Sequence, residues 1–239
     1  MTRGVLLAGE EAFRPAFVSL RIPGATNSVA LCSGVRIGPR HVVTAAHCLE
    51  DAKSLEVTTF NEKMQTSVWK SAGWKIHPKW TELKSARGLE AVAADLAVVV
   101  LNQKNPSPFV AIDLKVHSQI SGLKYVGVGR IEGDKRDGKP RRSENLSAEF
   151  HAKGGVGGAW VSRGSSILCH GDSGGPLLSE KGELVGIASG VGVPEGAPDS
   201  CGVGEVVYRA DVRTNINWMA CTFRGWGVAL PGFEQPDCR

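Results

Sequence analysis

The sequence contains the run Cys169-His170-Gly171-Asp172-Ser173-Gly174-Gly175-Pro176, in which one serine is surrounded by residues that allow sharp turns. Its three glycines permit backbone conformations that a β-carbon would forbid, so consecutive N–H groups can point at a common centre. Such a geometry suits the binding of a negatively charged oxygen. Ser173 alone predicts no chemistry, because a serine hydroxyl is a weak nucleophile until a base takes its proton.

A candidate base and a candidate acid lie upstream of this run. His47 stands in Thr44-Ala45-Ala46-His47-Cys48, and Asp95 stands at the start of the apolar run 95–101. The chain order His, Asp, Ser is one of the orders known for nucleophile triads. We therefore interpret His47, Asp95 and Ser173 as a candidate catalytic triad, in which His47 takes the proton of Ser173 and Asp95 orients the imidazole.

Taken together, these motifs resemble those of a known family. TAAHC at 44–48, DLAVVVL at 95–101 and GDSGGP at 171–176 resemble the trypsin/chymotrypsin-like serine proteases in composition, order and separation. The resemblance extends from about Phe17 to about Met219. It implies an all-β fold of two six-stranded antiparallel Greek-key barrels with a C-terminal helix.

The same resemblance implies a single peptidase domain over 1–239. We expect barrel one at about 17–104, barrel two at about 109–210, and the C-terminal helix and tail at 211–239. The helix is expected from Asp211 to Cys221, with Trp218 on its buried face. The composition agrees with this fold, because 30 glycines, 12 prolines and many short apolar runs between turn residues favour short strands over helices.

The composition gives no sign of a membrane or nucleic-acid partner. No apolar run reaches the length of a membrane span. The formal net charge of +4 is mild, and much of it lies in 134–142, where no aromatic residue interleaves with the charges. We interpret this segment as a solvated loop, and we expect a monomer that binds neither nucleic acid nor a membrane.

The six cysteines predict disulfides. They can pair in fifteen ways, and a zinc site is an alternative, although no CxxC or HxxxH spacing supports one. The resemblance implies the pairs Cys32–Cys48, Cys169–Cys201 and Cys221–Cys238. Disulfides predict an oxidising compartment, either extracellular or periplasmic. We expect no metal ion and no cofactor.

The N-terminal segment bears on activation. The apolar stretch 5–8 is too short for the core of a secretory signal, so we expect the sequence to be that of a mature chain, or of such a chain with an added initiator Met1. In the family, a freed apolar N-terminus inserts, and its ammonium pairs with the aspartate before the nucleophile, which is Asp172 here. The resemblance therefore implies a zymogen whose active form begins between Gly4 and Leu6.

The resemblance also assigns residues to the primary specificity pocket. Its floor is the residue six before the nucleophile, Ile167, which offers no charge to a Lys or Arg side chain. Ser189 and Val191 lie on the strand that binds the substrate backbone, and Val206 lies on the other wall. We expect Val191 and Val206 to face each other and to narrow the slot, as in a pocket of the elastase type that takes small aliphatic residues.

The function that the resemblance implies is that of a serine endopeptidase. It would cleave proteins or peptides through an acyl-enzyme, with the N–H groups of Gly171 and Ser173 as the oxyanion hole. A protein inhibitor is a further expected partner.

Two alternatives stay open. A protease-like protein could keep the fold as a binding surface with weak or absent catalysis, and an esterase of the α/β-hydrolase type would carry Gly-x-Ser-x-Gly with its histidine last, whereas His47 comes first here.

Overall fold

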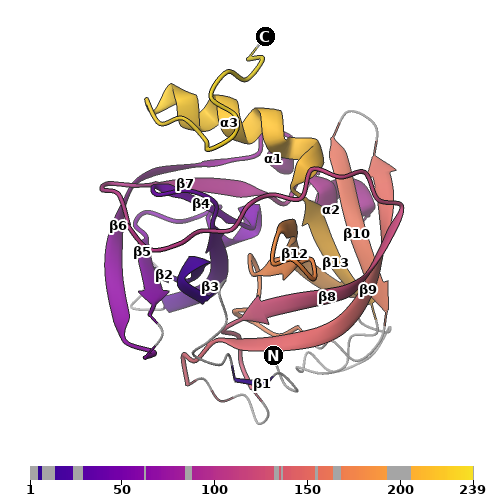
Figure 1. Cartoon of the computed structure of the whole chain (residues 1–239), viewed down its shortest axis with the longest axis horizontal. Coiled ribbons are helices and arrows are strands. Elements are labelled where there is room, and N and C mark those ends of the chain that lie inside the picture. The colour runs from indigo at the N-terminus through magenta and orange to yellow at the C-terminus, as the bar shows by residue number, and fades with distance from the viewer. Residues whose placement is uncertain are drawn as a thin grey trace.

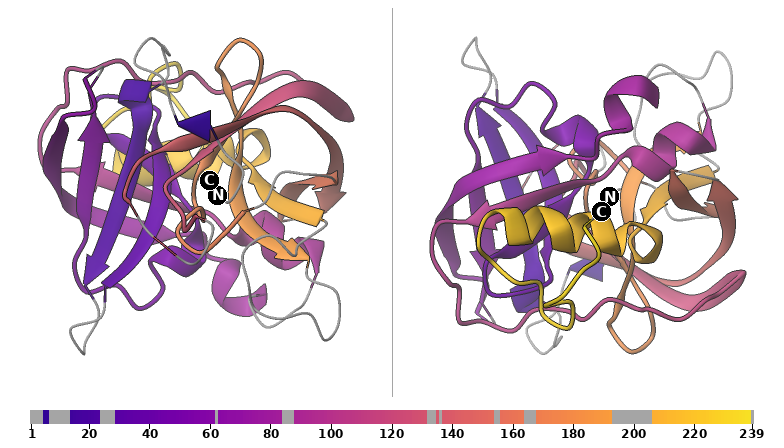
Figure 2. Two further views of the ribbon diagram at one scale, coloured as in Figure 1. Left: turned by 90° about the horizontal axis from the view of Figure 1, so that it is seen from below. Right: turned by 90° about the horizontal axis from the view of Figure 1, so that it is seen from above.

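Two six-stranded β-barrels lie side by side, and a helix follows them at the C-terminus (Figures 1 and 2). The structure is a computed structural model. It describes residues 5–6, 14–23, 29–61, 63–83, 88–131, 135, 137–153, 156–163, 168–192 and 206–238. The predicted fold class is confirmed, because the strands of both barrels pair antiparallel and both barrels close.

The first barrel closes in the strand order β2-β3-β4-β7-β6-β5. Its strands are β2 (Phe17–Pro23), β3 (Val29–Arg36), β4 (His41–Thr44), β5 (Glu56–Phe60), β6 (Thr66–Ile76) and β7 (Ala97–Leu101). Every residue of β4 and β7 is buried, because these paired strands face the barrel interior on one side while β12 and α3 pack against them on the other. A valine-rich strand suits this place, since β-branched side chains pack well on a buried pleated surface.

The second barrel runs in the order β9-β10-β13-β12-β11-β8 and closes where β8 pairs with β9. Its strands are β8 (Gln119–Gly127), β9 (Arg141–Lys153), β10 (Gly157–Arg163), β11 (Pro176–Leu178), β12 (Leu184–Gly192) and β13 (Val206–Asp211). The short strand β1 (Val5–Leu6) adds to β9, with Val5 opposite Arg142 and Leu6 opposite Arg141. The predicted boundaries of the two barrels within the chain stay a prediction.

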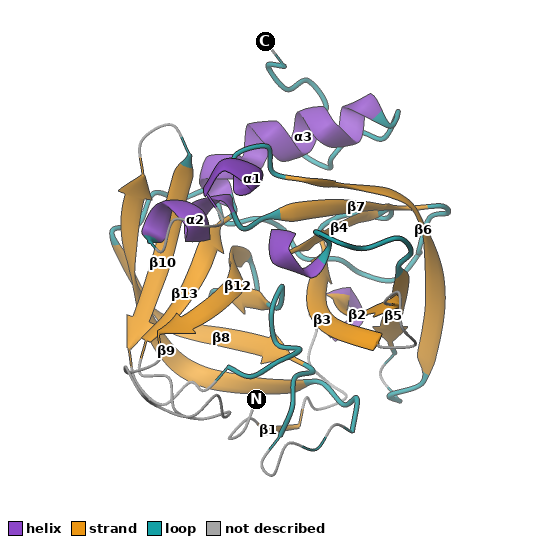
Figure 3. Cartoon of the chain, turned by 180° about the vertical axis from the view of Figure 1, so that it is seen from behind, coloured by secondary structure: helices purple, strands orange, loops and turns teal. Residues whose placement is uncertain are grey.

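The α-helices of the described residues gather on one side of the molecule (Figure 3). α1 (Trp80–Leu83) and α2 (Leu89–Ala94) lie in the connection between β6 and β7, where we expected no helix. The strong helix formers of α2, Leu, Glu and Ala, account for its local conformation. α2 packs against β10 and β13, so this connection of barrel one reaches the second barrel.

The C-terminal helix begins later than predicted. α3 (Ile216–Gly225) follows the short 3-10 helix η4 (Arg213–Asn215), and Asp211 still belongs to β13. The reason is local hydrogen bonding. The Asp211 carboxylate accepts from the indole N–H of Trp160 and from the backbone N–H of Thr214, both at 2.7 Å, so it ends the strand and precedes the first helical turn.

α3 packs on barrel one through apolar and aromatic side chains. Its buried residues are Met219, Ala220 and Phe223. Trp218 is partly exposed but packs against the core, as expected for the buried face of the helix, and it lies edge-on to His77 with 4.8 Å between ring centroids. His41 meets Phe223 in the same way at 4.5 Å. Burial lowers the pKa of His41 and of His77 to about 4, so both histidines pack as neutral rings at neutral pH.

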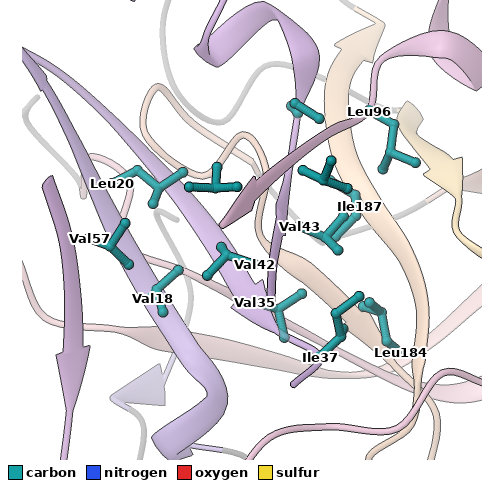
Figure 4. Close-up of a cluster of buried hydrophobic side chains, with 14 of the residues drawn as sticks. Val18, Leu20, Val35, Ile37, Val42, Val43, Val57, Leu96, Leu184 and Ile187 are labelled. Carbon is teal, nitrogen blue, oxygen red and sulfur yellow. The ribbon is translucent and has the colours of Figure 1, made fainter. Parts of the chain in front are cut away.

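One hydrophobic core extends from barrel one into the contact between the barrels. Figure 4 shows Val43 beside Ile187 of β12, and Ile37 beside Leu184 at the start of the same strand. A second cluster fills barrel two around Leu123 and neighbouring strands. None of the helices in the described ranges has the length and apolar character that crossing a membrane requires.

Two of the three predicted disulfides are confirmed, namely Cys32–Cys48 and Cys221–Cys238. Cys169 is also disulfide-bonded, while its expected partner Cys201 lies outside the described residues. The sulfur atoms of Cys32 and Cys48 lie within 4.8 Å of a ring nitrogen of His47, but they are bonded to each other and so offer no thiolate to a metal ion.

A buried arginine fixes the segment that joins the barrels. Arg36, the last residue of β3, is 0% exposed, and burial lowers its pKa to about 10. Its guanidinium donates to four backbone carbonyls, those of Pro15 (3.2 Å), Asn105 (2.9 Å), Ser107 (2.9 Å) and Pro108 (3.3 Å). These carbonyl dipoles take the place of water around the cation. Three of the four belong to the connection between the barrels, which is thereby held against barrel one.

We predict that Arg36→Met lowers the free energy of unfolding by about 3 kcal/mol, because it leaves several carbonyls without their donor. Urea unfolding followed by tryptophan fluorescence measures this change. Arg21→Met is the matched control. Arg21 pairs with Glu56 at 3.0 Å on the surface, with 48% and 46% of the two side chains exposed, so we expect a loss below about 1 kcal/mol. Equal losses in the two variants would contradict the role given to Arg36.

Candidate active site

His47 and Asp95 come together because the strands next to them pair. β4 pairs with β7, with Thr44 opposite Ala97. His47 lies in the 3-10 helix η2 (Ala46–Cys48) after β4, and Asp95 lies just before β7. Asp95 Oδ1 accepts from the backbone N–H of His47 at 2.9 Å, and Oδ2 accepts from its Nδ1–H at 2.7 Å. With the proton held at Nδ1, the neutral ring presents Nε2 as a base.

A third donor to Asp95 comes from the second barrel. Ser189 Oγ on β12 donates to Asp95 Oδ2 at 2.6 Å. Asp95 is only 1% exposed, and the three hydrogen bonds offset the cost of burying its charge. The sequence assigned Ser189 to substrate binding. In the structure its side chain holds the carboxylate that orients His47.

The environment of His47 favours its protonated form. Burial by itself lowers the pKa of His47, but the charge of Asp95 and its hydrogen bond outweigh burial and raise the pKa above its ordinary value. About one third of the side chain, 34%, is exposed, so the ring can meet a bound molecule. His47 is therefore suited to act as a general base, because Asp95 stabilises the imidazolium that forms when the ring takes a proton.

Ser173 lies beside the turn that carries His47. The Ser173 carbonyl accepts from the backbone N–H of Ser33 at 2.7 Å and lies 3.9 Å from the sulfur of Cys48, the residue after His47. Ser173 is partly exposed. Both Ser173 and His47 are among the described residues, and no hydrogen bond joins their side chains. The structure thus brings the three predicted residues to one place, while their catalytic roles stay a prediction.

The loop around Ser173 presents two N–H groups that suit an oxyanion hole. Gly171 and Gly174 have φ values of +99° and +81°, the left-handed region that favours glycine, as the sequence predicted for this turn. Within the described part of the chain, neither the N–H of Gly171 nor that of Ser173 donates to a backbone carbonyl. Both donors are therefore available to a negatively charged oxygen.

Asp172, the residue before Ser173, is 0% exposed. Burial raises the pKa of its carboxyl above the ordinary value, and hydrogen bonds from the N–H groups of Gly129 (2.8 Å) and Cys169 (2.9 Å) act in the opposite direction. Residues 1–4 lie outside the described residues, so the pairing of Asp172 with a free N-terminus stays a prediction. Leu6 lies on the surface strand β1 with 49% of the residue exposed, so its side chain is not inserted.

The expected pocket residues fall partly outside the described residues, where Ile167 lies. β12 and β13 pair with Val191 opposite Val207 and Gly192 opposite Val206. Opposite residues of antiparallel strands share a face, and neighbouring residues alternate between faces. Val191 and Val206 therefore lie on opposite faces, and the prediction that they face each other is wrong. The reason is that the pairing of β12 with β13 is shifted by one residue from the pairing that would set Val191 opposite Val206.

Sequence reasoning missed three side chains near the site. The Trp80 ring lies 6.4 Å from the His47 ring between centroids. The motif His-Pro-x-Trp that begins at His77 could have indicated it. Ser33 and Tyr125 are buried and contact the loop around Ser173, and nothing in their local sequence marks them.

Known proteins resemble this chain in fold and in sequence. A solved structure described as "Structure of GrC" superposes with a TM-score of 0.69 at 17% identity, covering 94% of this chain and 100% of that chain, which is a likeness of fold. Spermosin from Halocynthia roretzi is 25% identical over 279 aligned positions that take in 100% of this chain, and the chain spans 66% of the length of that relative. The family model described as Trypsin matches residues 8–210. Because that match takes in both barrels and the three motifs, the chain belongs to the trypsin family.

Proposed function

We propose that this chain is a serine endopeptidase that hydrolyses peptide bonds through an acyl-enzyme. One observation carries the proposal. The buried Asp95 carboxylate accepts hydrogen bonds from His47 N–H, His47 Nδ1–H and Ser189 Oγ, at 2.6 to 2.9 Å. A carboxylate held by these bonds fixes one tautomer of an imidazole near the partly exposed Ser173, which is the arrangement that a serine nucleophile needs.

In the proposed reaction, His47 Nε2 takes the proton of Ser173 as its Oγ attacks the peptide carbonyl. The new C–O bond forms as the carbonyl electron pair moves to oxygen, and the N–H groups of Gly171 and Ser173 stabilise that oxyanion, each by about 3 kcal/mol. His47 then gives the proton to the leaving amine and the C–N bond breaks. Water, deprotonated by the same ring, hydrolyses the acyl-enzyme and restores Ser173.

The alternative of a binding protein without catalysis is less well supported. Such a protein has no need for a buried carboxylate that raises the pKa of His47, and burying Asp95 has a cost that only its hydrogen bonds offset. An esterase with the same residues would use the same steps. The family favours peptide bonds, so proteins and peptides are the proposed substrates.

The proposed cleavage preference is for small aliphatic residues before the scissile bond. Its support is the sequence at Ile167, which offers no charge to a basic side chain. An apolar pocket discriminates by about 1–3 kcal/mol per methylene, so the preference is expected to be graded.

The disulfides Cys32–Cys48 and Cys221–Cys238 support the proposal that the protein works in an oxidising compartment.

The nucleophile is tested with Ser173→Ala. We expect turnover of a fluorogenic peptide to fall by about 10,000-fold or more, with the fold kept, because the attacking oxygen is removed. A fluorophosphonate probe should label the wild-type chain at Ser173, as peptide mapping by mass spectrometry would show, and should not label the variant. Ser179→Ala, which removes another buried hydroxyl after β11, is the control and should keep full activity. Wild-type activity in Ser173→Ala would exclude the mechanism.

The acid limb of the pH profile tests the His47–Asp95 pair. Only neutral His47 can take a proton, so kcat/KM should rise with pH through the pKa of His47. Since Asp95 raises that pKa, the midpoint should lie above the ordinary value of about 6.5. NMR titration of His47 in Ser173→Ala measures it directly. In the double variant Ser173→Ala/Asp95→Asn, His47 stays buried but loses the negative charge of Asp95. The pKa of His47 should therefore fall below about 6.5. An unchanged midpoint would show that Asp95 does not control the ring.

The substrate preference is tested with a peptide library that varies the residue before the cleaved bond. We expect Ala and Val to be cleaved faster than Phe, and Lys or Arg to be cleaved slowest, because a basic head would lie unpaired against Ile167. Mass spectrometry of the products gives the relative rates. Dominant cleavage after Lys or Arg would contradict the preference and leave the triad unaffected.

A further inference from the structure

We propose that two buried hydroxyls, those of Ser33 in barrel one and Tyr125 in barrel two, are positioning groups for the oxyanion hole. They hold the loop 170–173, here called the oxyanion loop, through its backbone carbonyls. The inference rests on the proposed function, because it concerns the orientation of the N–H groups of Gly171 and Ser173, which are the oxyanion donors in the proposed reaction. Neither hydroxyl belongs to the His47, Asp95 and Ser173 triad.

Ser33 joins several segments through one residue. It lies on β3 and is 0% exposed. Its Oγ donates to the Gly171 carbonyl at 2.8 Å and accepts from the N–H of Val128 at 3.1 Å. Its backbone N–H donates to the Ser173 carbonyl at 2.7 Å, and its own carbonyl accepts from Thr44 Oγ1 at 2.8 Å. Ser33 thus ties the oxyanion loop to the strand that leads to His47.

Tyr125 holds the next peptide unit of the same loop. Its hydroxyl, on β8, donates to the Asp172 carbonyl, which also accepts from the backbone N–H of Gly175 at 3.0 Å, so Tyr125 adds the side-chain donor from another segment. That carbonyl and the N–H of Ser173 belong to one planar peptide group, so fixing the oxygen fixes the direction of the N–H. A donor to the carbonyl also polarises the peptide and strengthens its N–H as a donor. The hydroxyl therefore acts on a predicted oxyanion donor through the peptide bond.

The surroundings keep Tyr125 in place and protonated. Tyr125 is 0% exposed, and burial raises the pKa of its hydroxyl well above the ordinary value, so it remains a donor. The Arg209 guanidinium lies over the ring, 5.5 Å from its centroid, and donates to Ser162 Oγ at 2.6 Å. The Tyr125 ring is thereby packed between charged and apolar groups of the second barrel.

Three consecutive carbonyls of the loop accept hydrogen bonds from other segments. His170 O accepts from the N–H of Arg130 at 2.9 Å, Gly171 O from Ser33, and Asp172 O from Tyr125. With its oxygens held, the loop cannot rotate a peptide without breaking a buried hydrogen bond. Gly171, at φ +99°, lacks the β-carbon that would otherwise restrict such rotation, so the hydrogen bonds supply the restriction.

The experiment measures kcat and KM for Tyr125→Phe and Ser33→Ala on the full chain. Rates are normalised to the number of sites that a fluorophosphonate titrates, so loss of folded protein does not count as loss of activity. We expect kcat to fall about 10-fold in Tyr125→Phe and at least as much in Ser33→Ala, with KM within about twofold of wild type. Ser179→Ala, whose Oγ accepts from the N–H of Glu183 outside the loop, is the matched control and should change neither constant.

A peptide aldehyde separates positioning from general destabilisation. It forms a tetrahedral adduct with Ser173 whose oxygen occupies the oxyanion hole, so its inhibition constant should rise by the same factor as kcat/KM falls. If the two hydroxyls only stabilised the fold, each variant would have a lower melting temperature, while its kcat/KM per titrated site and its inhibition constant for the aldehyde would be those of the wild type. Wild-type kcat in both variants, or a loss that appears only in KM, would overturn the inference. A wild-type chain that neither cleaves nor reacts with the probe would instead overturn the proposed function.

Discussion

The buried carboxylate of Asp95 is the constraint on which the arrangement of the two barrels depends. An ionised carboxylate that is 1% exposed costs several kcal/mol unless donors surround it. Two donors come from His47, on barrel one, and the third is Ser189 Oγ, on β12 of barrel two. A shift of one barrel against the other would remove a donor from Asp95. The position of the barrels and the orientation of His47 are therefore set by the same hydrogen bonds.

The apolar core supports that polar arrangement from the interior of the protein. Leu96 is 0% exposed directly after Asp95, and the cluster around it continues through β4 and β7 to β12. Core side chains pack at crystal-like density and resist displacement, so they hold the carboxylate at a fixed depth. The site is thus continuous with the interior of the protein. The proposed catalytic residues His47 and Ser173 stand at the edge of this core, where they reach solvent.

The sequence allowed the general plan to be predicted, because turn residues and reactive residues leave local signs. The glycines at 171 and 174 do adopt positive φ, and Asp95 lies just before a buried strand, β7. What escaped prediction depends on tertiary contacts. The register of β12 and β13 decides which face Val191 occupies, and a slip of one residue reverses it. Nothing near Ser33 in the chain reveals that its hydroxyl meets Gly171, which is 138 residues away.

The clamp formed by Arg36 has a consequence for how the chain folds. The last strand of barrel one ends at Leu101, but the carbonyls of Asn105, Ser107 and Pro108 that surround the guanidinium come later. A chain that stopped at Leu101 would keep only the Pro15 carbonyl for a buried cation. Barrel one is therefore stabilised by a segment that follows its last strand in the chain. During synthesis the buried guanidinium gains its full set of carbonyl acceptors only after this connecting segment has left the ribosome.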